Sequence, residues 1–158
     1  MKIYLIGLPG SGKSTIGSLL AKKLNYEFID TDTYIEEKAM MFIDEIFSSY
    51  GEDYFRALEI NALEELKEKD NVIISTGGGI IKNKENKKLM DGVIIYLDVD
   101  LDELDKRIKN SNIKRPLLEY KTIYDIYNER KELYEYFSDM KIKNDDKEEA
   151  IKEILKSL

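Results

Sequence analysis

The sequence predicts a three-layer α/β/α fold, in which helices cover both faces of a five-stranded parallel sheet. Two observations predict this class. Short apolar runs typical of buried strands recur along the chain, and segments with helical periodicity separate them. The chain has 158 residues, of which 42% are hydrophobic, which is enough for one domain with a substantial core. Because strands that alternate with helices form parallel sheets covered on both faces, we expect a single domain over 1–158.

The first half of the chain begins with an apolar run, Ile-Tyr-Leu-Ile, which predicts a buried strand at 3–6. Apolar residues at positions 16, 19, 20 and 24 share one face of a helix that we expect over 15–24. The run Tyr-Glu-Phe-Ile predicts a second, short strand at 26–29. Helical spacing then predicts helices at 33–39, 43–50 and 52–69.

The second half of the chain continues the alternation. The apolar runs Val-Ile-Ile-Ser and Val-Ile-Ile-Tyr-Leu predict strands at 72–75 and 93–97, and a last short strand is expected at 140–142. Helical patterns occupy 83–90, 101–110, 121–137 and 146–157, with a polar segment at 111–120. Since ligands of parallel sheets bind beyond the carboxyl ends of the strands, the loops that follow the strands are the candidate site.

Composition excludes several chemistries. The chain has no cysteine and no histidine, so disulfides, thiolate chemistry, histidine catalysis and the common zinc sites are excluded. Any general base must be Asp, Glu, Lys or Tyr. The net charge of −7 argues against a nucleic-acid-binding surface. No apolar run approaches the length of a membrane span and the N-terminus lacks a signal-peptide pattern, so we expect a cytoplasmic protein.

A glycine-rich loop, Gly-Leu-Pro-Gly-Ser-Gly-Lys-Ser at 7–14, links the first strand to the first helix. This spacing in this context is typical of a P-loop, and a chance glycine turn is the weaker interpretation. Glycines let backbone N–H groups turn toward phosphate oxygens, and the helix N-terminus adds partial positive charge. Lys13 is expected to reach the β- and γ-phosphates of a nucleotide, and Ser14 to hold Mg²⁺. The expected nucleotide-binding residues are Gly10, Ser11, Gly12, Lys13, Ser14 and Thr15.

Two carboxylates, Asp30 and Asp32, follow the second strand. One can face Mg²⁺ and its waters, while the other can orient a substrate hydroxyl and accept its proton as phosphate transfers. Helix capping is the alternative, and one carboxylate could do both. Many P-loop proteins carry a magnesium-binding Asp where this chain has Ser75, so metal assistance moves to Asp30.

Three consecutive glycines, 77–79, follow the third strand and would let a substrate lie directly on the backbone. Arginine is rare beside 21 lysines, and its planar fork suits carboxylate or phosphate. Arg56 can pair with Glu59 three residues later on a helix, either to aim the guanidinium at a ligand or as a solvated pair. Arg115 lies in the polar segment, from which a lid could bring its charge onto a transferring phosphoryl group.

These motifs together resemble the shikimate kinase family, in the nucleoside-monophosphate-kinase-like branch of P-loop proteins. The matching pieces are GLPGSGKST at 7–15, FIDTD at 28–32, DYFRALE at 53–59, STGGG at 75–79, RPLL at 115–118 and ERKELY at 129–134. They follow the family's order and approximate spacing over nearly the whole chain. The resemblance implies a P-loop kinase with strand order 2-3-1-4-5, which phosphorylates the 3-hydroxyl of shikimate with ATP in the chorismate pathway.

The resemblance assigns the nucleotide side as follows. Lys13 and Ser14 handle the phosphates and Mg²⁺, and Asp30 assists the metal through water. Arg115, on a lid at about 110–121, stabilises the transferred phosphate, and Arg107 stacks on adenine at the start of the lid. Relatives often place a second arginine against adenine in the loop at 143–147, where this chain has none, and the segment 109–114 is about one residue longer than in some relatives.

On the substrate side, the resemblance implies a binding segment at about 32–60. Asp32 holds the shikimate hydroxyls and acts as the base, while Arg56 and Arg130 bind the carboxylate. The backbone of Gly77, Gly78 and Gly79 meets the substrate. A kinase for gluconate or a nucleoside monophosphate, and a protein that only binds nucleotide, are the competing interpretations. We expect a monomer with ATP and shikimate as its only partners, without nucleic acid or membrane.

Overall fold

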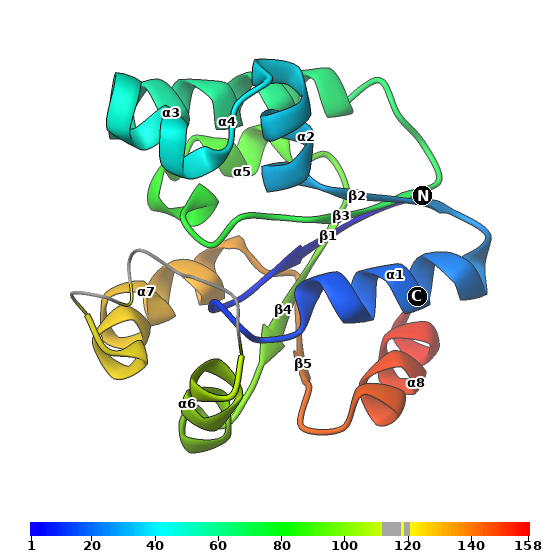
Figure 1. Ribbon diagram of the computed structural model, residues 1–158. Helices are drawn as coiled ribbons and strands as arrows, with labels where there is room; N and C mark the ends of the chain where they lie inside the picture. The colour runs from blue at the N-terminus through cyan, green and yellow to red at the C-terminus, as the bar shows by residue number, and fades with distance from the viewer. Residues whose placement is uncertain (112–117, 119–120) are drawn as a thin grey trace.

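A five-stranded parallel sheet forms the centre of the computed structural model, which describes residues 1–111, 118 and 121–158 (Figure 1). The strands are β1 (Lys2–Ile6), β2 (Glu27–Asp30), β3 (Val72–Ser75), β4 (Val93–Asp98) and β5 (Met140–Lys143). Their order is β2-β3-β1-β4-β5, and every neighbouring pair is parallel, which confirms the expected fold and strand order. β1 lies in the middle, because it pairs with β3 on one side and β4 on the other.

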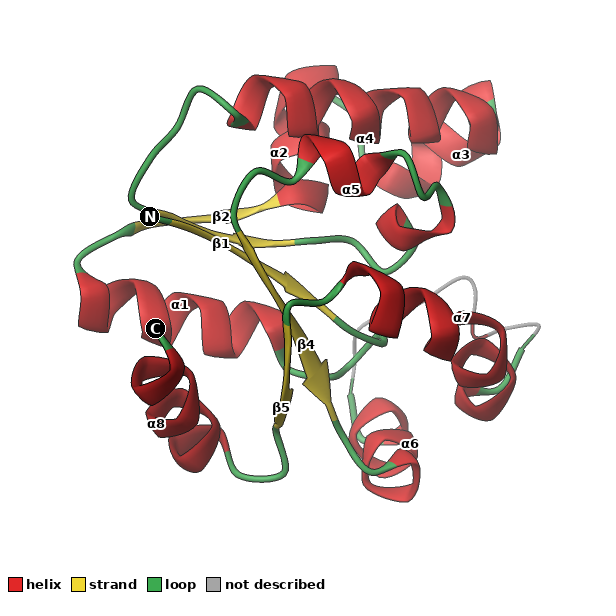
Figure 2. Cartoon of the chain, turned by 180° about the vertical axis from the view of Figure 1, so that it is seen from behind, coloured by secondary structure: helices red, strands yellow, loops and turns green. Residues whose placement is uncertain are grey.

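Helices cover both faces of the sheet (Figure 2). They are α1 (Lys13–Leu24), α2 (Thr31–Ala39), α3 (Ile43–Tyr50), α4 (Glu52–Leu66), the 3₁₀ turn η1 (Ile80–Lys82), α5 (Asn86–Leu89), α6 (Leu101–Lys109), α7 (Ile123–Phe137) and α8 (Lys147–Ser157). Within the described residues, no helix is long and apolar enough to cross a membrane.

The two core layers follow from the alternation of side chains along each strand. In β1, Ile3 and Leu5 face one layer, where they pack with α1 and α8. Tyr4 and Ile6 face the opposite layer, where they pack with α4 and α7. All four side chains are fully buried, so β1 is apolar on both faces, as a central parallel strand requires.

A smaller apolar cluster joins α2, α3 and α4 outside the main layers. Its buried members are Ile35, Ile46, Phe55 and Ala62. The cluster packs the three helices of the segment at 32–60 against one another. That this segment is a substrate-binding unit stays a prediction.

The predicted helix at 83–90 was wrong. The chain forms the 3₁₀ turn η1 and then only the four-residue helix α5. Two asparagine side chains account for the break, because they bond locally to the backbone and compete with helical hydrogen bonds. The Asn83 side chain accepts from the Glu85 N–H at 3.1 Å, and the Asn86 amide donates to the Ile80 carbonyl at 2.8 Å.

Other boundaries differ by a few residues. The helix predicted at 33–39 begins at Thr31, because the Asp30 carboxylate accepts from the N–H groups of Asp32 and Thr33 at 2.9 and 3.2 Å and caps it. The helix predicted at 52–69 ends at Leu66. The remaining predicted strands and helices lie within two residues of those observed.

We expect Leu63→Ala, on α4, to lower the free energy of unfolding by about 2–5 kcal/mol, because Leu63 is fully buried in the larger core layer. Leu155→Ala on α8 is the matched control: it makes the same change in a helix where the side chain is 36% exposed, and should cost less than about 1 kcal/mol. Urea denaturation measures both. Equal losses would contradict the assigned core.

Candidate active site

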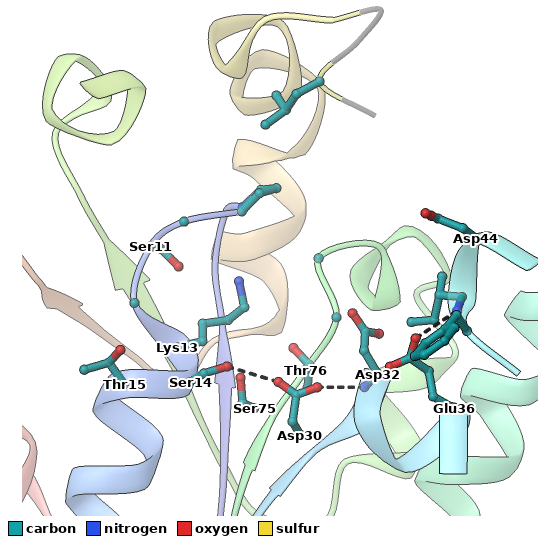
Figure 3. A pocket seen from close by; sticks show the side chains of 18 residues that line it. Ser11, Lys13, Ser14, Thr15, Asp30, Asp32, Glu36, Asp44, Ser75 and Thr76 are labelled. Carbon is teal, nitrogen blue, oxygen red and sulfur yellow. Dashed lines mark hydrogen bonds between the residues drawn. The ribbon is translucent and has the colours of Figure 1, made fainter. Parts of the chain in front are cut away.

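The loops that follow β1, β2 and β3 meet at the carboxyl edge of the sheet and enclose a cavity of about 740 Å³ (Figure 3). Residues 9–15 of the glycine-rich loop line one side. Asp32 and Glu36 also line the cavity, together with the start of the glycine triplet, and Asp30 lies next to Ser14 of the loop. The sequence therefore predicted the position of the cavity correctly, at the ends of three neighbouring strands.

The glycine-rich loop has the backbone of a phosphate cradle. Gly10 and Gly12 have φ angles of 79° and 93°, which favour glycine, and Gly12 directly precedes α1. The Lys13 ammonium donates to the carbonyls of Gly7 and Leu8 at 2.7 and 3.0 Å, so it lies over the loop. The N-terminus of α1, its amide groups and this lysine thus present positive charge to one cavity.

Ser14 and Asp30 lie together on the side of the cavity next to the loop. The Ser14 hydroxyl donates to the Asp30 carboxylate at 3.0 Å (Figure 3), and the other carboxylate oxygen caps α2. Asp30 therefore caps α2, and its role toward a metal stays a prediction. Oxygen donors of this kind suit Mg²⁺. Among the described residues, no group of three acidic side chains could hold a metal alone, so a Mg²⁺ ion here needs phosphate or water oxygens as well.

Asp32 is the carboxylate nearest the glycine triplet. A Cβ at Gly77 would lie 2.5 Å from its Oδ1 atom, so this carboxylate rests directly on the Gly77 backbone. Burial, reinforced by the charges of Asp30 and Glu59 and opposed by that of Lys13, raises the pKa of Asp32 to about 7. A carboxylate with this pKa can exchange a proton near neutral pH, as a general base must.

Each of the next two glycines contacts one of the predicted arginines. A Cβ at Gly79 would lie 2.5 Å from Arg56 Nη1, and a Cβ at Gly78 would lie 3.0 Å from Arg130 Nη1. Arg130 also donates from Nη1 to the Gly78 carbonyl at 2.8 Å. A side chain at Gly79 would therefore displace the Arg56 guanidinium, and one at Gly78 would crowd that of Arg130.

Arg56 is held on α4 between two carboxylates. It donates from Nη1 to Glu59 at 2.7 Å, as its spacing predicted, and from Nη2 to Glu52 at 3.3 Å. Glu59 is buried, which raises its pKa, while the adjacent Arg56 acts in the opposite direction. The pair therefore aims Arg56 at the backbone of the triplet and is more than a solvated helix pair.

Arg130 reaches the triplet from α7, and only 4% of it is exposed. Lys82, at the end of η1, lies in the field of both arginines, and burial together with these charges lowers its pKa. Its ammonium is 3.8 Å from Glu52. Around Gly78 and Gly79, these three cations outnumber the carboxylates of Glu52 and Glu59 by one, while Asp32 adds a third carboxylate at Gly77. The local excess of positive charge at Gly78 and Gly79 favours the carboxylate of an acidic ligand there.

Of the other two predicted arginines, the structure describes only Arg107. Arg107, on α6, donates to the Asn144 carbonyl at 3.0 Å and lies 3.7 Å from Glu103. Arg115, most of the expected lid and most of the RPLL motif lie outside the described residues, although Leu118 lines the cavity. Arg56, Arg130 and Arg107 are not among the residues that line the cavity, although Arg130 contacts Gly78, which does line it.

Several site residues were missed by the sequence analysis. Thr31 accepts from the Gly77 N–H at 2.9 Å, Glu36 lines the cavity, Glu52 and Lys82 complete the charged cluster, and Asn144 contacts the glycine-rich loop. Thr31 lies inside the noted Asp-Thr-Asp motif, which could have indicated it. The i,i+4 spacing of Glu52 and Arg56 on α4 could have indicated Glu52. The other three act through tertiary contacts that no local pattern indicates.

Known proteins resemble this chain over nearly its whole length. The family model of shikimate kinase matches residues 9–158. A shikimate kinase from Aquifex aeolicus is 42% identical and covers 100% of this chain and 96% of its own, and one from Clostridium botulinum (strain Loch Maree) is 50% identical over 84% and 82%. The structure of shikimate kinase from Acinetobacter baumannii in complex with shikimate has a TM-score of 0.90 at 31% identity and covers 99% of this chain and 91% of its own.

The identities, the coverage and the shared architecture agree with the motifs at the carboxyl edge of the sheet. The chain belongs to the shikimate kinase family.

Proposed function

We propose that the protein transfers the γ-phosphoryl group of ATP to the 3-hydroxyl of shikimate, which gives shikimate 3-phosphate for aromatic amino-acid biosynthesis. One observation carries the proposal: the Asp32 carboxylate shares a cavity with the phosphate cradle and rests on a glycine strip that two arginines also contact. A hydroxy acid that directs its carboxylate toward the arginines presents its hydroxyls to Asp32. The family to which the chain belongs supports the same substrate.

In this arrangement, catalysis is positioning plus neutralisation of charge. The loop amides and Lys13 bind the β- and γ-phosphates. Ser14 and Asp30 would hold Mg²⁺, which would supply positive charge to the phosphate oxygens. Asp32 orients the acceptor hydroxyl. As the bond from its oxygen to phosphorus forms, the proton passes to Asp32, and the bond to the β-phosphate oxygen breaks with its electron pair retained by ADP.

The remaining parts of the proposal rest on the family resemblance and on composition. Arg107 stacks on adenine, and Arg115 stabilises the transferred phosphoryl group. The protein acts as a monomer in the cytoplasm, with the segment 32–60 as its substrate-binding unit. The loop at 143–147 contains no arginine that could contact adenine. In this proposal, Lys147 or the loop backbone makes that contact instead.

The test is a coupled ADP-release assay with Mg-ATP and shikimate, run beside gluconate, AMP and CMP. We expect turnover with shikimate alone. Asp32→Asn should lower kcat by about 10²-fold or more, because the amide neither accepts the proton nor carries the charge. Turnover with another acceptor would refute the substrate. Nucleotide binding without turnover of any acceptor would support a protein that only binds.

We expect Arg130→Lys to raise KM for shikimate by about tenfold or more, because an ammonium cannot replace the guanidinium fork that contacts Gly78 and, in the proposed complex, binds the shikimate carboxylate. Affinity for Mg-ADP should change less than about twofold, since Arg130 does not line the phosphate side of the cavity. Steady-state kinetics and calorimetry measure these quantities. An unchanged KM would contradict a carboxylate site at the triplet.

The raised pKa of Asp32 also predicts a dependence of stability on pH. The folded protein keeps a proton on Asp32 up to about pH 7, whereas the unfolded chain releases it near the ordinary value of 3.8. Native protein therefore binds more protons between these values, and this group makes stability fall as pH rises through that window.

Asp32→Asn removes this contribution. Between about pH 5 and pH 8, the free energy of unfolding of the unliganded wild type should fall by on the order of 1–3 kcal/mol more than that of the variant. Urea denaturation of both proteins at both pH values tests this prediction. The other titrating groups are common to the two proteins, so their contributions cancel when the two pH dependences are subtracted. Parallel pH profiles would show that burial leaves Asp32 unperturbed.

A further inference from the structure

Asn144 lies in the turn between β5 and α8, and its backbone is fixed on both sides. Its N–H donates to the Asp98 carbonyl, at the end of β4, at 2.8 Å. Its carbonyl accepts from Arg107 Nη2, on α6, at 3.0 Å. Only 3% of the residue is exposed. With its backbone held in this way, Asn144 directs its side chain toward the glycine-rich loop.

The Asn144 amide packs against the peptide that joins Ser11 and Gly12. Its Nδ2 atom donates to the Ser11 carbonyl at 2.8 Å, across 133 positions of sequence. A Cβ at Gly12 would lie 2.5 Å from the same Nδ2 atom, so the amide occupies the space that a side chain at position 12 would take. Gly12 is therefore required both by its φ angle of 93° and by the approach of Asn144.

The geometry of a peptide unit gives this contact a consequence for the site. Peptide bonds in the described residues are trans, and the C=O and N–H of a planar trans peptide point in opposite directions. With the Ser11 carbonyl directed at Asn144, the Gly12 N–H is directed away from Asn144. Ser11 and Gly12 both line the cavity, so this N–H is presented on the side where phosphate binds.

We propose that Asn144 is a positioning residue for nucleotide, which holds the Ser11–Gly12 peptide in the orientation that offers the Gly12 N–H to a phosphate oxygen. This inference rests on the proposed nucleotide site and does not depend on the identity of the acceptor. Without the hydrogen bond, the peptide can rotate and bring a carbonyl oxygen toward the phosphates, which repel it. Since Asn144 acts through Ser11, it is distinct from the residues that contact the reacting atoms.

Asn86 provides a matched control. It is also 3% exposed, and its amide donates to a backbone carbonyl, that of Ile80, at the same distance of 2.8 Å. In both residues, the amide oxygen is buried without a hydrogen-bond partner among the described residues. Asn86 contacts η1, away from the glycine-rich loop. The same substitution therefore removes a hydrogen bond from a side-chain amide to a backbone carbonyl at both sites. The bond of Asn144 holds the glycine-rich loop, whereas that of Asn86 holds η1.

The experiment compares Asn144→Leu with Asn86→Leu, in which a side chain of similar size cannot donate. Calorimetry gives Kd for Mg-ADP and for shikimate without nucleotide, and thermal denaturation gives stability. We expect both variants to lose stability, but only Asn144→Leu to weaken Mg-ADP binding, by about tenfold. Its Kd for shikimate should stay within about twofold of wild type. In ¹⁵N-labelled protein, the shift of the Gly12 amide on Mg-ADP binding should shrink in Asn144→Leu alone.

Equal loss of Mg-ADP affinity in the two variants, or an unchanged affinity in Asn144→Leu, would overturn the proposal and leave Asn144 a structural residue. If Asn144→Leu cannot be purified folded, Asn144→Ala and Asn86→Ala decide by the same comparison. A wild-type protein that binds no Mg-ADP would instead refute the proposed function, so the two failures are distinguishable. Wild-type binding without shikimate turnover would leave this inference standing.

Discussion

The central position of β1 is the constraint on which the site depends. Because β1 pairs in parallel with both β3 and β4, the loops after all three strands leave the sheet at one edge. β2 extends this edge beyond β3 and brings Asp30 into register with Ser75. The phosphate cradle, the two aspartates and the glycine triplet come from distant parts of the chain. They share one cavity because backbone hydrogen bonds fix the strands that precede them.

The glycines at the site allow charged side chains to approach the backbone closely. A Cβ at Gly77 or Gly79 would lie 2.5 Å from a charged side chain, and a Cβ at Gly78 would lie 3.0 Å from Arg130. The paired Glu52 and Glu59 do not fully neutralise the cations around Gly78 and Gly79, while Asp32 adds a carboxylate at Gly77.

The sequence predicted the sheet, its order and the residues that carry a motif, because these features are local or shared by the family. Arg56 illustrates this success: its pairing with Glu59 follows from helical spacing alone. Asn144 illustrates the limit, since its partner is 133 positions away and its residue type predicts only a turn. The helix predicted at 83–90 is reduced to α5 for a related reason that acts over a few residues. The side chains of Asn83 and Asn86 form hydrogen bonds with nearby backbone groups and compete with helical hydrogen bonds, which the periodic pattern does not reveal.

The burial of Arg130 has a consequence for the thermodynamics of ligand binding. A long cationic side chain on the surface loses conformational entropy when a ligand immobilises it, at a cost of about 0.5–1.5 kcal/mol. Arg130 is already ordered, because α7 holds it against the Gly78 carbonyl and beside Tyr134, which stacks on Tyr96 with ring centroids 4.9 Å apart. Folding has thus already fixed this side chain. In the proposed complex, the carboxylate of shikimate meets a guanidinium whose ordering no longer opposes binding.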